Sequence, residues 1–250
     1  MKKYIIFLSI CLFVFNACEL TEVNYDPNEV NDVPIDRILP IAESQVANST
    51  YMRLSPIIGI FLQTLVPNTS SSNNYLPYST YYADNSFAVQ DIWADFYVNP
   101  MEYFKIIIEK AKEENAPHYS GIAKVLQAYC LGTLTSAWGD IPYSEAFKGS
   151  ENLNPKYDGQ QSIYSEIQDL LNSAINDFNM PAGNKTPGSV DLFFNGDMTK
   201  WEKVAHGLKA RYFIHLTKRA SEIGFSPVDS ALAQVAMLFD SNNLDLEYQY

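Results

Sequence analysis

The sequence predicts a mainly α-helical protein built from helical hairpins. From residue 35 onward, most segments repeat apolar residues every three or four positions, which is the spacing of one helix face. Polar residues of the kinds that cap helices precede several of these segments. No convincing run of alternating apolar and polar residues, as expected for a half-buried strand, is present. Helices of this length, joined by short loops, are typical of hairpins that pack as a superhelix.

The first eighteen residues predict export and a lipid anchor. Lys2 and Lys3 precede an apolar run over residues 4–15, which is too short to span a bilayer as a stable helix. The small residue Ala17 stands directly before Cys18, as in a bacterial lipoprotein signal. We therefore expect residues 1–17 to be removed and Cys18 to carry the lipid. An ordinary signal peptide and a simple N-terminal membrane anchor remain as alternatives.

A tether and three helices are expected next. Residues 18–34 are polar and contain two prolines, which predicts a lipidated tether, and the helical domain is expected over residues 35–250. Its first helices are predicted over residues 35–49, over residues 89–115 with a break at Asn99-Pro100, and over residues 119–137.

Three later helices are expected to begin at capping boxes, in which two polar side chains three residues apart each satisfy a backbone amide. The pairs are Asp158 with Gln161, Thr199 with Glu202, and Ser226 with Asp229. Apolar stripes follow the first two caps, which predicts that each of these helices buries one face.

The charge and the cysteine content exclude several classes of protein. A net charge of −12 disfavours binding to nucleic acid or to anionic lipid surfaces. Cys11 leaves with the signal and Cys18 is lipidated, so Cys130 cannot form a disulfide within the chain. Cys130 lies in an apolar helical stretch and is expected to be a small buried side chain. Stability must therefore come from packing.

No cofactor, metal site or catalytic centre is predicted. His206 and His215 lie nine residues apart on one predicted helix, so they face opposite ways. Asp140 and Glu145 could form a glycosidase pair, but acidic pairs are common in a chain with 29 Asp and Glu residues. The sequence contains no nucleophile-elbow, zinc-protease or phosphate-loop motif. Binding, and not catalysis, is the expected activity.

One segment has the composition of a recognition loop. Residues 69–87 contain five aromatic side chains, many Ser, Thr and Asn residues, and Asp84 as the one charged residue. Tyrosine offers a flat apolar face and a hydroxyl at low entropy cost, and Ser and Asn add hydrogen bonds. The alternative is that these tyrosines pack beneath a long loop. The candidate ligand-binding residues are Asn73, Asn74, Tyr75, Tyr78, Tyr81 and Tyr82.

Two other conspicuous segments are interpreted as structural. In the first, Gly139 can adopt positive φ, Asp140 can accept local backbone N–H bonds, and Pro142 stiffens the exit from the turn. Such a turn ends one helix and orients the next segment. The same interpretation applies to the Asn-Gly-Asp turn that precedes the next tryptophan. The candidate structural residues are Trp138, Gly139, Asp140, Pro142, Tyr143, Asp197 and Trp201.

Four segments, in order, resemble the SusD/RagB family of surface nutrient-binding lipoproteins of Bacteroidetes. The sequence WGDIPYSEA at residues 138–146 matches one family block, and NPKYDGQQSIY at residues 154–164 matches the pattern P-x-Y-D-x-Q-x-x-I-Y. Residues 195–211 are similar to the pattern GD-x-x-K-W followed by L-K-x-R, and Asp26-Pro27-Asn28 fits the start of the mature family. The closest similarity is to the SusD-like branch.

The resemblance implies tetratricopeptide-like helical hairpins packed as a right-handed superhelix, with long aromatic-rich loops. It also implies a place on the outer-membrane surface and a SusC-like TonB-dependent barrel as partner. Family members bind oligosaccharides or, in the RagB-like branch, oligopeptides, and they are not enzymes. They are about twice as long as this chain, so the chain is expected to be an N-terminal half or a truncated form.

The function expected from these observations is capture of oligosaccharide or oligopeptide for an outer-membrane transporter, without bond cleavage. The alternative is a helical adaptor lipoprotein that binds only a protein partner. A lipid-anchored glycosidase that uses Asp140 or Glu145 is the third hypothesis and the weakest.

Overall fold

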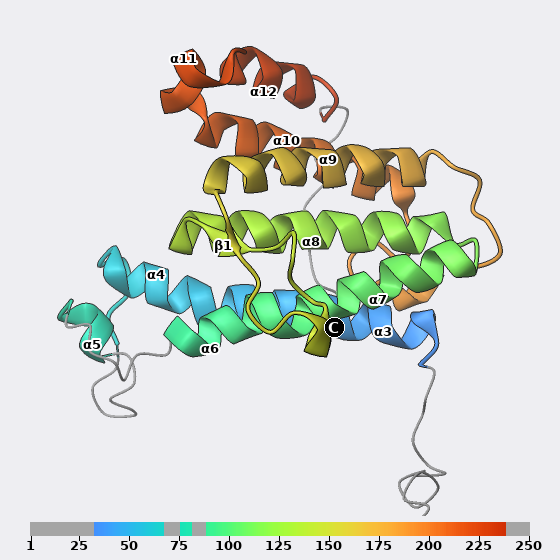
Figure 1. Cartoon of the computed structure of the whole chain (residues 1–250), viewed down its shortest axis with the longest axis horizontal. Coiled ribbons are helices and arrows are strands. Elements are labelled where there is room, and N and C mark those ends of the chain that lie inside the picture. Colours follow the sequence, from blue (N-terminus) through green and yellow to red (C-terminus); the bar gives the residue numbers. More distant parts are fainter. Residues whose placement is uncertain (1–32, 68–75, 82–88, 239–250) are drawn as a thin grey trace, which may run out of the picture. The chain divides into compact units, whose positions relative to one another are not determined.

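The computed structural model describes residues 33–67, 76–81 and 89–238, which form a mainly helical fold (Figure 1). The chain divides into Met1–Val33 and Pro34–Tyr250, and the helices described below all belong to the second unit. The expected signal peptide, Cys18 and most of the tether lie outside the described residues. Within the described ranges, no helix combines the length and the apolar character needed to cross a membrane.

The described residues of the second unit form five long helices and several short elements. The long helices are α3 (Ile35–Asn48), α7 (Asn99–Glu113), α8 (Pro117–Trp138), α9 (Gln160–Phe178) and α10 (Met198–His215). The short α-helices are α4 (Ser55–Phe61), α5 (Leu76–Ser79), α6 (Val89–Trp93), α11 (Ala220–Ile223) and α12 (Pro227–Val235). The π-helical turns are η1 (Ser49–Leu54) and η3 (Ala94–Val98), and the 3-10 turns are η4 (Gly149–Glu151), η5 (Gly188–Val190) and η6 (Thr217–Arg219). The two short strands are β1 (Ile141–Pro142) and β2 (Tyr157–Asp158), which pair antiparallel.

The helices pack in order along the chain. Helix α8 lies between α7 and α9, and α10 packs against both α9 and α12 (Figure 1). Helix α3 packs against α7 and also contacts α8. Neighbouring helices are joined by short connections between α7 and α8 and by longer ones after α8 and α9. The predicted fold of helical hairpins is confirmed.

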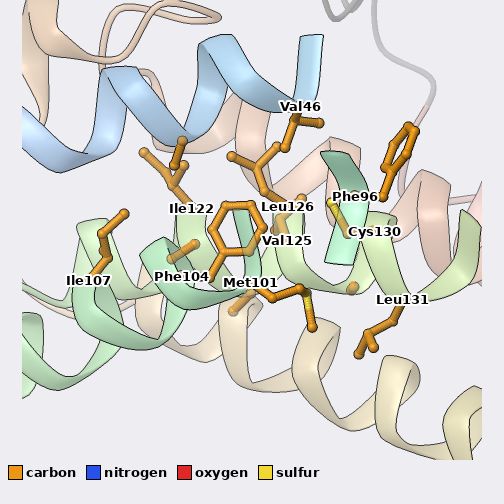
Figure 2. Close-up of a cluster of buried hydrophobic side chains, with 14 of the residues drawn as sticks. Val46, Phe96, Met101, Phe104, Ile107, Ile122, Val125, Leu126, Cys130 and Leu131 are labelled. Atoms are coloured by element: carbon orange, nitrogen blue, oxygen red, sulfur yellow. The ribbon is translucent and has the colours of Figure 1, made fainter. Parts of the chain in front are cut away.

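The core extends from α3, η3 and α7 across α8 to α9 and α10. Helix α8 is buried on most of its circumference, which its run of apolar and small residues allows. Cys130 is fully buried there, and burial raises the pKa of its thiol well above the usual range, so the prediction of a small buried side chain is confirmed. Figure 2 shows the core residues Val46, Phe96, Met101, Phe104, Ile107, Ile122, Val125, Leu126, Cys130 and Leu131.

The predicted helix boundaries are partly confirmed. The helix expected over residues 119–137 is α8, and the helix expected from residue 35 begins at Ile35. Its helical backbone continues through η1 and α4 to Phe61, further than predicted. The expected break at Asn99-Pro100 is wrong, because Val98 and Asn99 keep helical dihedral angles. Pro100 lies in the first turn of α7, where its ring and its missing N–H are tolerated.

Of the three residues predicted to cap these helices, only Ser226 caps its helix as predicted. The Ser226 hydroxyl accepts a hydrogen bond from the Asp229 amide at the start of α12. At α10 the prediction of Thr199 is wrong, because the cap is Asp197, whose carboxylate accepts from the Thr199 and Lys200 amides. At α9 the prediction of Asp158 is also wrong, because that side chain bonds to a distant turn described below.

A buried pair of carboxyl groups joins α3 to the segment before α10. Asp191 is 2% exposed and accepts hydrogen bonds from the Phe193, Phe194 and Gly196 amides and from the Trp201 indole. Glu43 of α3 is fully buried, and one of its oxygens accepts from the Leu192 amide at 2.8 Å. Burial, and secondly the charge of Asp191, together raise the pKa of Glu43 to about 9. Glu43 is therefore protonated at neutral pH, while Asp191 is held as the acceptor of four donors.

The raised pKa of Glu43 predicts that the fold loses stability as the pH rises from about 4.5 to about 9. In the unfolded chain Glu43 loses its proton near pH 4.5, whereas in the folded chain it keeps the proton up to about pH 9. The stabilising contribution of this group is therefore complete below pH 4.5 and is lost as the pH rises toward 9. Over that range, Glu43 lowers the free energy of unfolding by up to about 1.4 kcal/mol per pH unit.

The isosteric variant Glu43→Gln isolates this effect. We expect urea unfolding at pH 5 to give similar midpoints for the wild type and Glu43→Gln. At pH 8 the variant should be the more stable protein, because its amide carries no charge at either pH. Parallel loss of stability in both proteins from pH 5 to pH 8 would contradict the assignment to Glu43.

Candidate functional site

The structure describes two of the six predicted ligand-binding residues. Asn73, Asn74, Tyr75 and Tyr82 lie outside the described residues. Tyr78 belongs to α5, and Tyr81 follows two residues after that helix ends. The predicted loop over residues 69–87 is therefore interrupted by one helical turn.

Tyr78 is a buried side chain. It is 2% exposed, and its ring packs edge-on against Phe61 of α4 with ring centroids 5.7 Å apart. A residue in this position anchors α5 to α4 and offers no face to a ligand. The burial of Tyr78 thus argues against the predicted ligand contact and favours the alternative that some of these tyrosines pack beneath the loop.

Tyr81 presents its ring at the surface in a constrained position. The residue is 56% exposed, and its ring lies 5.8 Å from the Phe61 ring at a tilt of 48°. Its hydroxyl donates a hydrogen bond of 2.9 Å to the Phe61 carbonyl oxygen. The backbone of Tyr81 has a φ of 53°, a left-handed conformation that is unfavourable for a bulky residue. Three constraints therefore orient this ring before any ligand arrives.

Exposed apolar side chains from the end of α4 belong to the same region. Phe61 and Leu62 are exposed, as are Leu65 and Val66 in the turn that follows. The turn folds back on α4, because the Thr64 and Leu65 amides both donate to the Gly59 carbonyl oxygen. We call Phe61, Leu62, Leu65, Val66 and Tyr81 the α4–α5 surface. Sequence reasoning missed its α4 half, although the apolar run at residues 57–62 is longer than one buried helix face requires.

A second aromatic cluster links η3 to the strand β1. Trp93 stacks on Tyr97 with centroids 4.6 Å apart and meets Trp138 edge-on at 5.3 Å. The Tyr97 ring also contacts Phe147, and its hydroxyl donates to the Pro142 carbonyl oxygen at 2.8 Å. Burial raises the pKa of Tyr97 to about 12, so the hydroxyl remains a donor at neutral pH. These rings are partly buried against one another, and they hold the turn after α8 in place.

The turn at residues 138–143 has the geometry of a helix end. Helix α8 ends at Trp138, and Gly139 adopts a φ of 78°, as its predicted role requires. The prediction that Asp140 accepts local backbone bonds is wrong. Its carboxylate accepts a 2.8 Å bond from the Gln160 amide, twenty residues away at the start of α9. Asp140 therefore supplies a tertiary cap for α9, since Gly159 at the capping position has no side chain.

Strands β1 and β2 join two of the conspicuous sequence segments. Ile141 pairs with Asp158, and Pro142 pairs with Tyr157. The Asp158 carboxylate accepts from the Tyr143 amide and from the amide and hydroxyl of Ser144. Burial opposes ionisation of Asp158, but the hydrogen bonds outweigh it and lower its pKa. The segments at residues 138–146 and 154–164 thus form one structural unit.

The remaining predicted structural residues lie at the start of α10. Asp197 caps the helix, as described above, and Trp201 is completely buried with its indole N–H bonded to Asp191. The Phe193 and Phe194 rings both meet Trp201 edge-on.

The histidines and the acidic residues singled out in the sequence have separate partners in the structure. No group of three or more His, Cys, Asp or Glu side chains among them is placed to hold a metal ion. His206 contacts Gln234, whereas His215 contacts Tyr164. The Glu145 carboxylate forms an ion pair with Lys156, and Asp140 is occupied by the Gln160 amide. Both carboxylates of the hypothetical glycosidase pair therefore have structural partners.

A groove runs between α3–η1 and α10, with α8 between them. Two adjoining cavities of about 350 and 480 Å³ share Thr50, Tyr129 and Arg211 in their linings. The Thr50 and Tyr129 hydroxyls lie 3.1 Å apart and bond to each other. We call this feature the Arg211 groove and define it by Val46, Thr50, Tyr129, Val204, Leu208 and Arg211. Its walls come from three distant segments, so no local sequence pattern predicts it.

Both the sequence and the fold are similar to those of known proteins. The family model described as "Starch-binding associating with outer membrane", SusD-like, matches residues 27–250. A solved SusD/RagB family protein from Bacteroides thetaiotaomicron is 25% identical and superposes on 86% of this chain with a TM-score of 0.76. A chitin-binding protein is 23% identical over 85% of the chain, with a TM-score of 0.70. A chitin-binding SusD homologue from Flavobacterium johnsoniae is 19% identical over 78% of the chain, with a TM-score of 0.60.

These similarities bear mainly on the fold. The chain spans 45% of the first two structures and 42% of the third. At identities below 25%, the two chitin-binding proteins show a shared fold and no more. No curated protein matches the sequence.

Proposed function

This chain belongs to the SusD-like family, and on that premise we propose that it captures oligosaccharides at the cell surface for import. The transporter in this proposal is a SusC-like TonB-dependent barrel in the outer membrane, and lipid on Cys18 holds the protein beside it. The protein acts by binding and breaks no bond. Oligopeptides are the second class of ligand within the same proposal.

The observation that carries the proposal is the presentation of Tyr81. Sugar rings have C–H faces that pack on aromatic rings, and a ring that is already oriented loses little entropy on binding. Tyr81 is half-exposed, tied through its hydroxyl to Phe61, and flanked by an apolar surface. The adjoining residues 68–75 and 82–88 are rich in Ser, Asn and Tyr, which suit the hydroxyl groups of a glycan. We therefore propose the α4–α5 surface, together with these residues, as the ligand site.

Two further observations support the rest of the proposal. The pattern of residues 1–18 is that of a lipoprotein signal, and the family description includes association with the outer membrane. Two of the similar structures are chitin-binding proteins, which makes chito-oligosaccharides a reasonable first ligand to test beside starch fragments.

Titration calorimetry tests the proposed function. The chain without its first 18 residues would be titrated with malto-oligosaccharides, chito-oligosaccharides, plant and host glycan fragments, and mixed oligopeptides. We expect saturable heat with one ligand class, with a Kd on the order of micromolar to millimolar for an exposed aromatic site. Circular dichroism would first establish that the protein is helical.

Other outcomes would separate the competing functions. A folded protein that gives no heat with any ligand would contradict glycan capture and favour the adaptor that binds only a protein. Turnover of a glycan, lost in both Asp140→Asn and Glu145→Gln, would favour the glycosidase.

A further inference from the structure

The Arg211 groove is a largely apolar surface with one exposed cation at its edge. Cavity-lining residues come from α3–η1, from α8 and from α10, and most of them are apolar. Along α8 the lining extends from Val125 to Ala137, which is roughly 18 Å of helix. An extended chain covers that distance with about six residues. An apolar groove of this length, left open by the described residues, is unusual on a stable protein and calls for an occupant.

Arg211 lacks an acidic partner in the described part of the chain. Among residues 33–67, 76–81 and 89–238, the ion pairs do not include Arg211, whose guanidinium lies 6.0 Å from the Tyr212 ring centre. Its helix is basic in an acidic protein. Helix α10 contains three lysines and Arg211 against the single acidic residue Glu202, whereas the whole chain has a net charge of −12. The groove therefore favours an occupant that combines apolar side chains with negative charge.

The last described residue of the chain lies beside this groove. Leu238 is the last described residue, and its amide donates to the Val235 carbonyl oxygen just after α12. A Cβ atom added to Gly207 would meet Leu238 at 3.8 Å. Gly207 itself lines the groove on α10. Residues 239–250 thus begin at the wall of the groove.

The sequence of residues 239–250 has the composition that the groove favours. The segment contains three acidic residues and no Lys or Arg. From residue 244 to residue 250 it alternates strictly: Leu244, Leu246, Tyr248 and Tyr250 are apolar or aromatic, and Asp245, Glu247 and Gln249 stand between them. Extended backbone places the two sets on opposite sides. Twelve residues reach roughly 40 Å when extended, more than twice the length of the groove.

We propose that residues 239–250 of this same chain occupy the Arg211 groove. Leu244, Leu246 and Tyr248 fill the two cavities, and Asp245 or Glu247 pairs with the Arg211 guanidinium at the groove edge. The long Arg211 side chain reaches the solvent side of the segment, where these carboxylates lie. The segment ties α10 and α12 to α3.

Photo-crosslinking from the segment tests this proposal. p-Benzoylphenylalanine would replace Tyr248 in the chain without its first 18 residues, and mass spectrometry would map the crosslinks after irradiation. The proposal predicts intramolecular crosslinks to peptides that contain residues 46–54, 125–137 or 201–211. Crosslinks to other surfaces, or no crosslink, would overturn it. Crosslinks between two molecules would show a second copy in the groove and would equally overturn it.

A charge reversal with a matched control tests the electrostatic part. Arg211→Glu replaces attraction with repulsion, and we expect the crosslink yield to fall about fivefold. Arg219→Glu removes an exposed arginine that already pairs with Glu222 and does not line the groove, so the yield should not change. Equal loss in both variants would overturn the pairing with Arg211. The crosslink map of the chain with native Arg211 remains decisive if Arg211→Glu fails to fold.

Discussion

Asp191→Ala is expected to lower the free energy of unfolding by about 3–5 kcal/mol. The Asp191 carboxylate is buried and accepts from three backbone amides and from the Trp201 indole. Its removal leaves four buried donors without an acceptor and opens a cavity next to Trp201. Urea unfolding followed by circular dichroism and tryptophan fluorescence would measure the loss.

Asp197→Ala is the matched control for this prediction. Asp197 lies six residues further along the same segment, but its carboxylate is near the surface and caps α10 through two amides. Loss of such a cap destabilises a protein by about 1 kcal/mol. The two variants should therefore differ by several kcal/mol. Similar losses in both would contradict the role of Asp191 as the buried centre of this region.

Gly132→Ala is expected to destabilise the protein by about 1–3 kcal/mol, although alanine is the better helix former. Gly132 lies inside α8, where α10 comes close, and an added methyl group would overlap the ring of Tyr212. Tyr212 cannot move aside easily, because it is buried and its hydroxyl donates to the Tyr129 carbonyl oxygen. Thermal unfolding would show a lower Tm than that of the wild type.

Gly207→Ala supplies the control on the facing helix. Gly207 also lies inside a helix, α10, but among the described residues an added Cβ would meet only Leu238, at an ordinary contact distance of 3.8 Å. Alanine should therefore stabilise this position by up to about 1 kcal/mol. A destabilising Gly132→Ala beside a neutral or stabilising Gly207→Ala would locate the close approach of α8 and α10. The reverse order would contradict the helix packing.

Local patterns predicted the helices well and their ends less well. The apolar periodicity of residues 119–137 reports burial directly, so α8 was predicted nearly to its ends. Capping depends on which of several polar residues reaches the free amides. Thr199 fits the capping-box pattern at α10, but Asp197, two residues earlier, holds the cap. Asp158 does not cap α9 as predicted, because its carboxylate accepts hydrogen bonds from the Ser144 amide and hydroxyl. The local sequence does not encode this tertiary contact.

The candidate site was also predicted only in part. Composition identified residues 69–87 as a recognition segment, but it could not distinguish buried Tyr78 from exposed Tyr81. That distinction depends on how α5 packs against Phe61, twenty residues earlier in the chain. The Arg211 groove was not predicted at all. It exists only because α3, α8 and α10 meet in three dimensions.

Glycan capture at the α4–α5 surface is tested most directly by titrating the best ligand of the calorimetric panel into two tyrosine variants. Tyr81→Ala removes the oriented ring, and Tyr157→Ala removes a tyrosine from β2 that is even more exposed and lies outside the proposed site. We predict that Tyr81→Ala weakens binding by about tenfold or more, as expected for loss of one stacking ring, while Tyr157→Ala binds like the wild type. Unchanged affinity in Tyr81→Ala, with both variants folded, would contradict the proposed site.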